Sequence, residues 1–95
     1  MIFGIVVGTV VGTKKSDNIV GTKYQLVHLC NERGEDGSEY LVALDGVGAG
    51  MDEMVIVSQG SSCRQTEVTK EKPIDALIVG IVDLVEKNGE IVFRK

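Results

Sequence analysis

The chain opens with the stretch MIFGIVVGTVVGT, residues 1–13, which carries no charged side chain. Large and small residues alternate along one face of this stretch, which is typical of a strand that curves tightly around a small barrel. The stretch therefore predicts a long, bent first strand from Met1 to about Lys14. Read at the period of two of a β-strand, that face carries Ile2, Gly4, Val6, Gly8, Val10 and Gly12, and the other carries Phe3, Ile5, Val7, Thr9, Val11 and Thr13.

The rest of the chain consists of short apolar segments separated by Gly, Asn and Asp. Valine and isoleucine account for 23 of the 95 residues, and these β-branched side chains favour strands over helices. Serine caps within Gly60–Glu67 predict one or two helical turns. Asn88-Gly89 predicts a tight hairpin, because both residues tolerate positive φ angles. We therefore expect an all-β fold with one short helix. The further strands are predicted at Lys23–Cys30, Tyr40–Leu44, Glu53–Ser58, Ile74–Val85 and Glu90–Arg94.

Length and charge exclude several classes of function. A chain of 95 residues with 43% hydrophobic residues predicts a single small domain, residues 1–95. The net charge of −4 and the presence of only four aromatic residues disfavour nucleic acid as a partner, because nucleic acid is bound by Lys and Arg and by stacked rings.

Residues 1–13 lack the basic segment of a secretory signal, and no apolar run reaches the roughly 18 residues of a membrane span. We therefore expect a soluble cytosolic protein with no membrane partner, whose Cys30 and Cys63 are reduced.

The segment from Ala76 to Val85 is apolar on both of its faces. Only one face of a barrel strand points inward, so the other face needs a covering partner. A chain of this size has little left to provide one, and we expect a second copy of the chain to do so. One face carries Leu77, Val79, Ile81 and Val85, and the other carries Ala76, Ile78, Val82 and Leu84.

The glycine-rich stretch Gly46-Val47-Gly48-Ala49-Gly50 invites comparison with a phosphate-binding loop. Such a loop opens a helix and is followed by Gly-Lys-Ser/Thr, whereas this stretch continues through Met51-Asp52-Glu53 into a predicted strand. A tight loop placed for contact with a neighbouring molecule is the better interpretation.

The candidates for chemistry are few. His28 and Cys30 alternate on one predicted strand face, but even with Cys63 nearby no fourth ligand stands at zinc-site spacing. One histidine and no Gly-x-Ser-x-Gly elbow leave no recognisable nucleophilic triad. Asp75 and Asp83 could form an acid/base pair, yet paired charges at a subunit contact explain them better, together with Arg64. We expect no catalytic residues, no metal and no cofactor.

Four stretches, in this order, resemble the signature sequences of the EutN/CcmL family, the vertex proteins of bacterial microcompartment shells. The resemblance covers nearly the whole chain and includes the opening Gly4-x-Val6-x-Gly8-Thr9 strand. Cys63 stands where family members more often carry a small residue such as Ala. The four stretches are Asp45–Glu53, Ser58–Arg64, Pro73–Ala76 and Val79–Asp83.

The resemblance implies a small closed β-barrel related to the OB fold, of about five to six strands, assembled as a homopentamer. It implies a structural role in the bacterial cytoplasm, at the fivefold corners of a shell tiled by hexameric and trimeric shell proteins. A closed ring needs a head-to-tail interface in which one patch meets a different patch on the next copy. Our candidates for subunit or shell contacts are Gly48, Ala49, Gly50, Ser61, Ser62, Arg64, Asp75 and Asp83.

An alternative from another class is a monomeric OB-like module that binds a nucleotide, an oligosaccharide or a single strand on its barrel face. The barrel would be the same in both cases, so the fold cannot separate them. The acidic charge and the scarcity of aromatic residues favour the shell protein.

Overall fold

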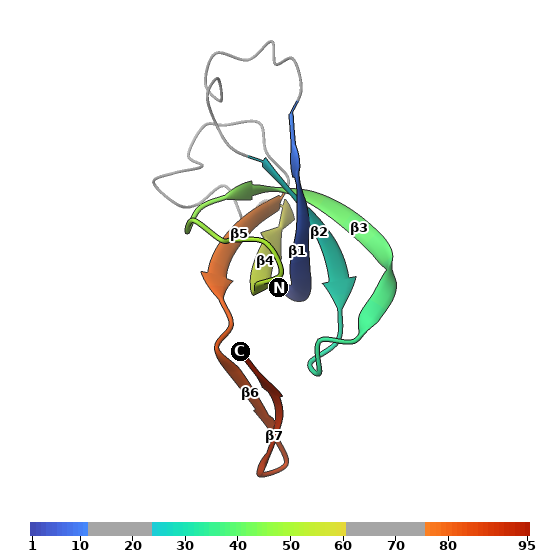
Figure 1. Cartoon of the computed structure of the whole chain (residues 1–95), viewed down its shortest axis with the longest axis vertical. Helices are drawn as coiled ribbons and strands as arrows, with labels where there is room; N and C mark the ends of the chain where they lie inside the picture. Colours follow the sequence, from blue (N-terminus) through green and yellow to red (C-terminus); the bar gives the residue numbers. More distant parts are fainter. Residues whose placement is uncertain (12–23, 61–75) are drawn as a thin grey trace.

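The computed structural model describes residues 1–11, 24–60 and 76–95, which form strands and the loops that join them (Figure 1). Five strands close into a barrel and two form a separate hairpin. The described residues contain no α-helix, and the short helix expected within Gly60–Glu67 lies almost entirely outside them. The strands are β1 (Ile2–Val10), β2 (Tyr24–Cys30), β3 (Asp36–Asp45), β4 (Met54–Gln59), β5 (Ala76–Ile81), β6 (Leu84–Lys87) and β7 (Glu90–Arg94).

The barrel has the strand order β1-β2-β3-β5-β4, with β4 pairing back onto β1. All neighbours are antiparallel except β3 and β5, which run parallel and pair only through Leu44 with Leu77 and Asp45 with Ile78. The all-β barrel predicted from the sequence is therefore confirmed. β3 and β4 are not neighbours, so they lie as far apart around this ring as five strands allow.

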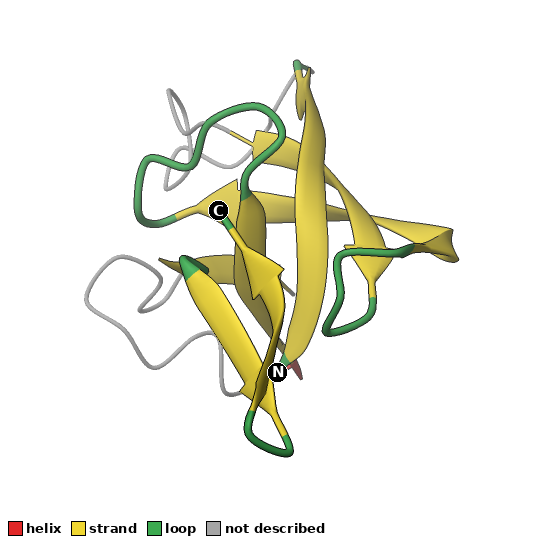
Figure 2. Cartoon of the chain, turned by 60° about the horizontal axis from the view of Figure 1, so that its bottom comes forward, coloured by secondary structure: helices red, strands yellow, loops and turns green. Residues whose placement is uncertain are grey.

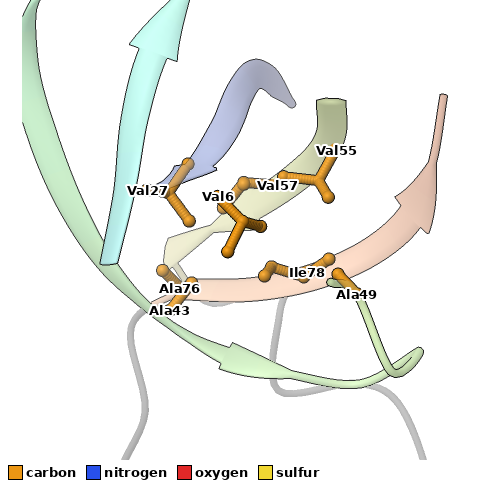
Figure 3. Packing of buried hydrophobic residues seen from close by; sticks show 8 residues of the cluster. All are labelled: Val6, Val27, Ala43, Ala49, Val55, Val57, Ala76 and Ile78. Atoms are coloured by element: carbon orange, nitrogen blue, oxygen red, sulfur yellow. The ribbon is translucent and has the colours of Figure 1, made fainter. Parts of the chain in front are cut away.

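The interior of the barrel is filled by small and β-branched side chains from every strand (Figure 3). These side chains are at most 4% exposed within a single chain, because the tight curvature leaves room for valine and alanine but for few larger residues. Ala49 enters this core from the loop between β3 and β4. The cluster comprises Val6, Val27, Ala43, Ala49, Val55, Val57, Ala76 and Ile78.

The first strand curves as predicted, with one departure. Gly4 and Val6 are buried and point inward, but the pairing of β1 with β2 shifts between Val6 and Gly8. This bulge at Val7 places one extra residue in β1 and reverses the side-chain alternation beyond it. Thr9 now pairs with Gln25, on the same face of the sheet as Val6. The prediction that Thr9 lies on the opposite face from Val6 was wrong for this reason.

The single strand predicted over Ile74–Val85 is divided in two. β5 ends at Ile81, the chain bends at Asp83, and β6 starts at Leu84 and leaves the barrel. The amide of Val82 donates to the carbonyl oxygen of Met54 at 2.8 Å, which holds the chain against β4 just after β5 ends. Apolar residues flank the bend on both sides, and the single charged residue at it, Asp83, did not lead to a predicted break.

The outer face of β5 is covered within the chain at Leu77, which is 3% exposed and packs against Leu44, Tyr24 and Val79. The prediction that a second copy must cover this face was therefore wrong at Leu77. Apolar side chains remain exposed elsewhere, on β3 and on the β6–β7 hairpin.

The β6–β7 hairpin extends away from the barrel beside the start of β1 (Figures 1 and 2). Its tip has φ of 55° at Asn88 and 81° at Gly89, which confirms the predicted turn with two positive φ angles. The turn between β2 and β3 supports the hairpin: Lys87 Nζ lies 2.6 Å from Glu32 Oε2, and Gly34 faces the ring of Phe93. No helix among the described residues has the length and hydrophobicity that crossing a membrane would require.

Candidate functional site

The loop that joins β3 to β4 is organised by the carboxylate of Asp45. Its Oδ1 atom accepts hydrogen bonds from the backbone amides of Val47, Gly48 and Ala49 at 3.1, 2.8 and 3.1 Å. Gly48 has φ of 75°, a conformation in which a β-carbon is unfavourable, and this lets consecutive amides converge on one oxygen. An aspartate directly before a glycine-rich stretch is the sequence signal for such a turn.

Gln25 fixes this loop from inside the barrel, where its side chain is 2% exposed. Its Nε2 atom donates to Asp45 Oδ2 at 3.3 Å and to the carbonyl oxygen of Ala49 at 3.0 Å, while Thr9 Oγ1 donates to its Oε1 atom at 3.3 Å. Partial burial acts to raise the pKa of Asp45, but the hydrogen bonds from Ala49, Val47, Gly48 and Gln25 outweigh it and leave that pKa lowered. Asp45 is therefore held as a carboxylate.

This geometry argues against phosphate binding by the glycine-rich loop. The amides that would receive a phosphate already converge on the carboxylate of Asp45, an anion supplied by the chain itself. A phosphate would have to displace this covalently attached competitor. The loop is a rigid connection between two barrel strands, with the side chains of Val47 and Met51 exposed on it.

A second group of charges closes the other end of the loop. Glu53 Oε1 accepts from the amide of Gly50 at 2.6 Å, and Glu53 Oε2 lies 2.7 Å from Lys95 Nζ. Lys95 also reaches Asp83, with 3.8 Å between Nζ and Oδ1 and a 2.9 Å bond from its amide to the carbonyl oxygen. The side-chain hydrogen bond from Lys95, followed by the Gly50 amide, lowers the pKa of Glu53. This cluster ties β7 to the β3–β4 loop.

His28 lies on the outside of β2 beside β3. Its Nε2 atom donates to the carbonyl oxygen of Gly37 at 2.8 Å, its Nδ1 atom lies 3.6 Å from Asp36 Oδ1, and its ring stacks on Tyr40 with centroids 4.4 Å apart. Burial, and next the charge of Asp36, raise the pKa of Cys30. In residues 1–11, 24–60 and 76–95 no three His, Cys, Asp or Glu side chains gather in a metal-binding arrangement.

Among the described residues, two apolar surfaces remain open on the barrel. The first, which we call the β3 face, consists of Tyr40 and Val42, 58% and 48% exposed, with the half-buried Leu26 beside them. It is apolar although it faces solvent, so it is a candidate contact surface.

The second surface, which we call the hairpin groove, lies between the barrel and the hairpin. It has a volume of about 560 Å³, and its walls come from β1, β4 and β6. A smaller apolar hollow beside Met1 and Ile2 shares Phe3 and Ile56 with it. The groove is lined by Phe3, Ile56, Ile81, Val82, Leu84 and Val85, with Asp83 and Glu86 at its rim.

The residues predicted as subunit or shell contacts lie in different environments. Gly48 and Gly50 lie in the loop ordered by Asp45, whereas the side chain of Ala49 is 1% exposed and belongs to the core of its own chain. The Asp83 side chain is 82% exposed and lies beside the apolar lining of the hairpin groove. Ser61, Ser62, Arg64 and Asp75, like Cys63, lie outside the described residues.

Sequence reasoning did not find the β3 face or the floor of the hairpin groove. Tyr40 and Val42 were assigned to a strand without a prediction of which face is open, and Phe3 and Ile56 come from strands far apart in the sequence. Gln25 was also missed, although a glutamine between apolar strand residues is a signal for a buried hydrogen-bonded side chain.

The sequence matches one family model over residues 1–83, described as "Ethanolamine utilisation protein EutN/carboxysome". The chain is 42% identical over its full length, and 95% of the relative's, to "Carboxysome shell vertex protein CcmL" of Gloeobacter violaceus. It is 46% identical to "Bacterial microcompartment shell vertex protein GrpN" of Rhodospirillum rubrum, covering 90% of this chain and 97% of that one.

Solved structures agree with the sequence comparison. "Structure of Gloeobacter violaceus CcmL" superposes with a TM-score of 0.93, covering 100% of this chain and 98% of that chain at 42% identity. "GrpN pentameric microcompartment shell protein from Rhodospirillum rubrum" superposes with a TM-score of 0.82, covering 92% of this chain and 99% of that chain at 46% identity.

Proposed function

Because the chain belongs to the EutN/CcmL family of microcompartment shell proteins, we propose that five copies of it form a ring that caps a fivefold vertex of such a shell. The protein is structural. Its place is the shell of a microcompartment in a bacterial cell, as for the relatives named shell vertex proteins.

The physical need for such a ring follows from geometry. Sixfold units tile a flat sheet, and a closed polyhedral shell requires fivefold units at its corners to introduce curvature. A cyclic ring of identical subunits requires two different patches on each chain, which meet between successive copies. The described residues provide two separate apolar surfaces, the β3 face and the hairpin groove, which a monomer would leave in water.

The observation that carries the proposal is the full-length likeness to a pentameric protein. This chain superposes on the GrpN structure over 92% of its own length and 99% of that chain. The geometry of the described residues offers no competing chemistry, since the glycine-rich loop is occupied by its own carboxylate.

The ring would be bordered by other shell proteins, for which we propose hexameric and trimeric units. The candidate contacts toward neighbouring subunits or these units are the backbone at Gly48 and Gly50, the loop side chains of Val47 and Met51, and Asp83, which are exposed or at the surface. Ser61, Ser62, Arg64 and Asp75 stay candidates from the sequence.

The native mass of the purified protein tests the pentamer. Light scattering behind size exclusion should give about 51 kDa, five times the chain mass of 10.2 kDa. Co-expression with a shell hexamer should then yield closed particles that depend on this chain, seen by electron microscopy. A stable species of about 10 kDa with salt-sensitive binding of single-stranded nucleic acid would contradict the proposal and favour the monomeric ligand-binding module.

A further inference from the structure

We propose that the β3 face of one copy docks into the hairpin groove of the next copy, and that this contact, repeated five times, closes the ring. The inference rests on the pentamer proposed above and assigns its two complementary surfaces. Tyr40 and Val42 form one side, and Phe3, Ile56 and Leu84 form the other.

The positions of the two surfaces fit a ring. The β3 face belongs to β2 and β3, and the groove belongs to β4, the start of β1 and β6. Tyr40 and Val42 lie on β3 and Ile56 lies on β4, and these two strands are not neighbours in the barrel order, so the two surfaces are separate. A contact between two unlike, separate surfaces repeats head to tail, whereas a surface that met its own copy would stop at a dimer.

Tyr40 projects from one of the two surfaces, and the other surface is a hollow. Tyr40 stands out from β3 with 58% of its surface exposed, and the stacked ring of His28 supports it. The Nε2 bond of His28 to Gly37 holds that support in place. An immobilised aromatic side chain loses little conformational freedom on docking, and such residues carry much of the binding energy of interfaces. The hairpin groove is concave, and its floor is apolar.

The polar groups also match. Tyrosine combines an apolar ring with a hydroxyl donor that needs an acceptor once it is buried. The groove has an apolar floor at Phe3 and Ile56 and carboxylates at its rim, Asp83 and Glu86. A tyrosine ring on the floor would place its hydroxyl near these acceptors. This use of Asp83 also gives a reason for an exposed carboxylate beside an apolar groove.

The test uses one charged variant for each surface. Val42→Glu places a charge on the β3 face, and Leu84→Glu places one on the wall of the groove, where the native side chain is already 45% exposed. Each variant alone should fall from about 51 kDa to the 10.2 kDa of a single chain at micromolar concentration. An equimolar mixture should form a species of about 20 kDa, twice 10.2 kDa, because one intact face can still meet one intact groove.

Val11→Glu is the matched control, because Val11 is exposed at the end of β1 and belongs to neither surface. It should stay at about 51 kDa. If it also dissociates, the effect is not specific to the two surfaces and the assignment is overturned. A variant of either surface that keeps the full mass overturns the assignment, as does a mixture that stays monomeric. If the unmodified protein is itself monomeric, the proposed pentamer fails as well.

Cross-linking reports on the interface without disturbing it by charge. In a background with Cys30→Ser and Cys63→Ala, Val42→Cys combined with Leu84→Cys should give a ladder of covalent species up to five chains with a short bis-maleimide. Val11→Cys combined with Leu84→Cys should remain single chains under the same conditions. No ladder from the first pair, in a protein that keeps the pentameric mass, would overturn the docking.

Discussion

Gly4 on β1 and Val27 on β2 approach so closely that a β-carbon on Gly4 would overlap Cγ1 of Val27. The two residues lie on adjacent strands, because Gly4 pairs with Leu29 and Val6 pairs with Val27. Val27 is completely buried, and its methyl group occupies the space that the missing side chain leaves. The glycine at position 4 is thus a packing requirement of this barrel.

Gly4→Ala should therefore destabilise the protein by about 1–3 kcal/mol, because the added methyl overpacks a filled core. Gly8→Ala is the matched control, since a β-carbon at Gly8 would come no nearer than 3.7 Å to Leu26. Urea unfolding at one fixed protein concentration measures the difference. Val27→Ala combined with Gly4→Ala should recover part of the loss, and equal losses at both glycines would contradict the packing argument.

Asp45→Asn should cost about 1–3 kcal/mol, although it changes the shape of the side chain little. The new amide nitrogen would replace Oδ2 and face Gln25 Nε2, so two donors would meet where a donor and an acceptor now stand. Asp52→Asn is the control, because Asp52 is exposed and its φ of 66° suits asparagine. Thermal unfolding at pH 7 compares the two variants, and similar losses would contradict a special role for Asp45.

The same carboxylate makes stability depend on pH. The pKa of Asp45 is lower in the folded chain than the value of about 3.9 for an unfolded aspartate. Its contribution is therefore fully present above that unfolded value and is lost as the pH falls through the lowered folded pKa. The melting temperatures of the native protein and of Asp45→Asn should converge as the pH falls below the unfolded value of about 3.9 and through the lowered folded pKa. A difference that stays constant over this range would show that ionisation of Asp45 contributes nothing.

Two exposed ion pairs allow a crossed test. Side-chain hydrogen bonds from Lys95 and Lys87 lower the pKa of Glu53 and of Glu32, respectively. Lys95→Met should raise the pKa of Glu53 and leave Glu32 unchanged, and Lys87→Met should do the reverse. Carbon-detected NMR titration of the carboxyl groups gives both values in each variant. A shift of both glutamates in one variant would mean that the β6–β7 hairpin had moved as a whole.

The fold was predictable because the strand signals are local. The strand signal at the start of the chain and the Asn88-Gly89 turn each depend on neighbouring residues; the turn is confirmed, and the predicted alternation is confirmed as far as Val6. The break after Ile81 and the bulge at Val7 were missed, since each depends on hydrogen bonds to a strand distant in the sequence. β3 likewise begins at Asp36, four residues before the predicted start, because Asp36 still pairs with Cys30 of β2.

The candidate surfaces were harder to predict. Glycines in 46–50 marked the right loop, but the residue that organises it is Asp45, which acts through three amides and Gln25. Exposure on the β3 face depends on which side chains of β3, Tyr40 among them, point away from the barrel interior. A pattern of single residues cannot supply this, because it depends on register between strands.

The core of the barrel is already buried within one chain, so we expect folding of the chain to precede assembly of the ring. Val27, Val55, Val57 and Ile78 lose all contact with water before any second copy arrives. Burial of these side chains during refolding should therefore proceed at a rate independent of protein concentration, and ring closure should follow as a slower step whose rate rises with concentration. We expect a newly made subunit to fold alone and to keep both apolar surfaces, the β3 face and the hairpin groove, exposed until it meets other copies.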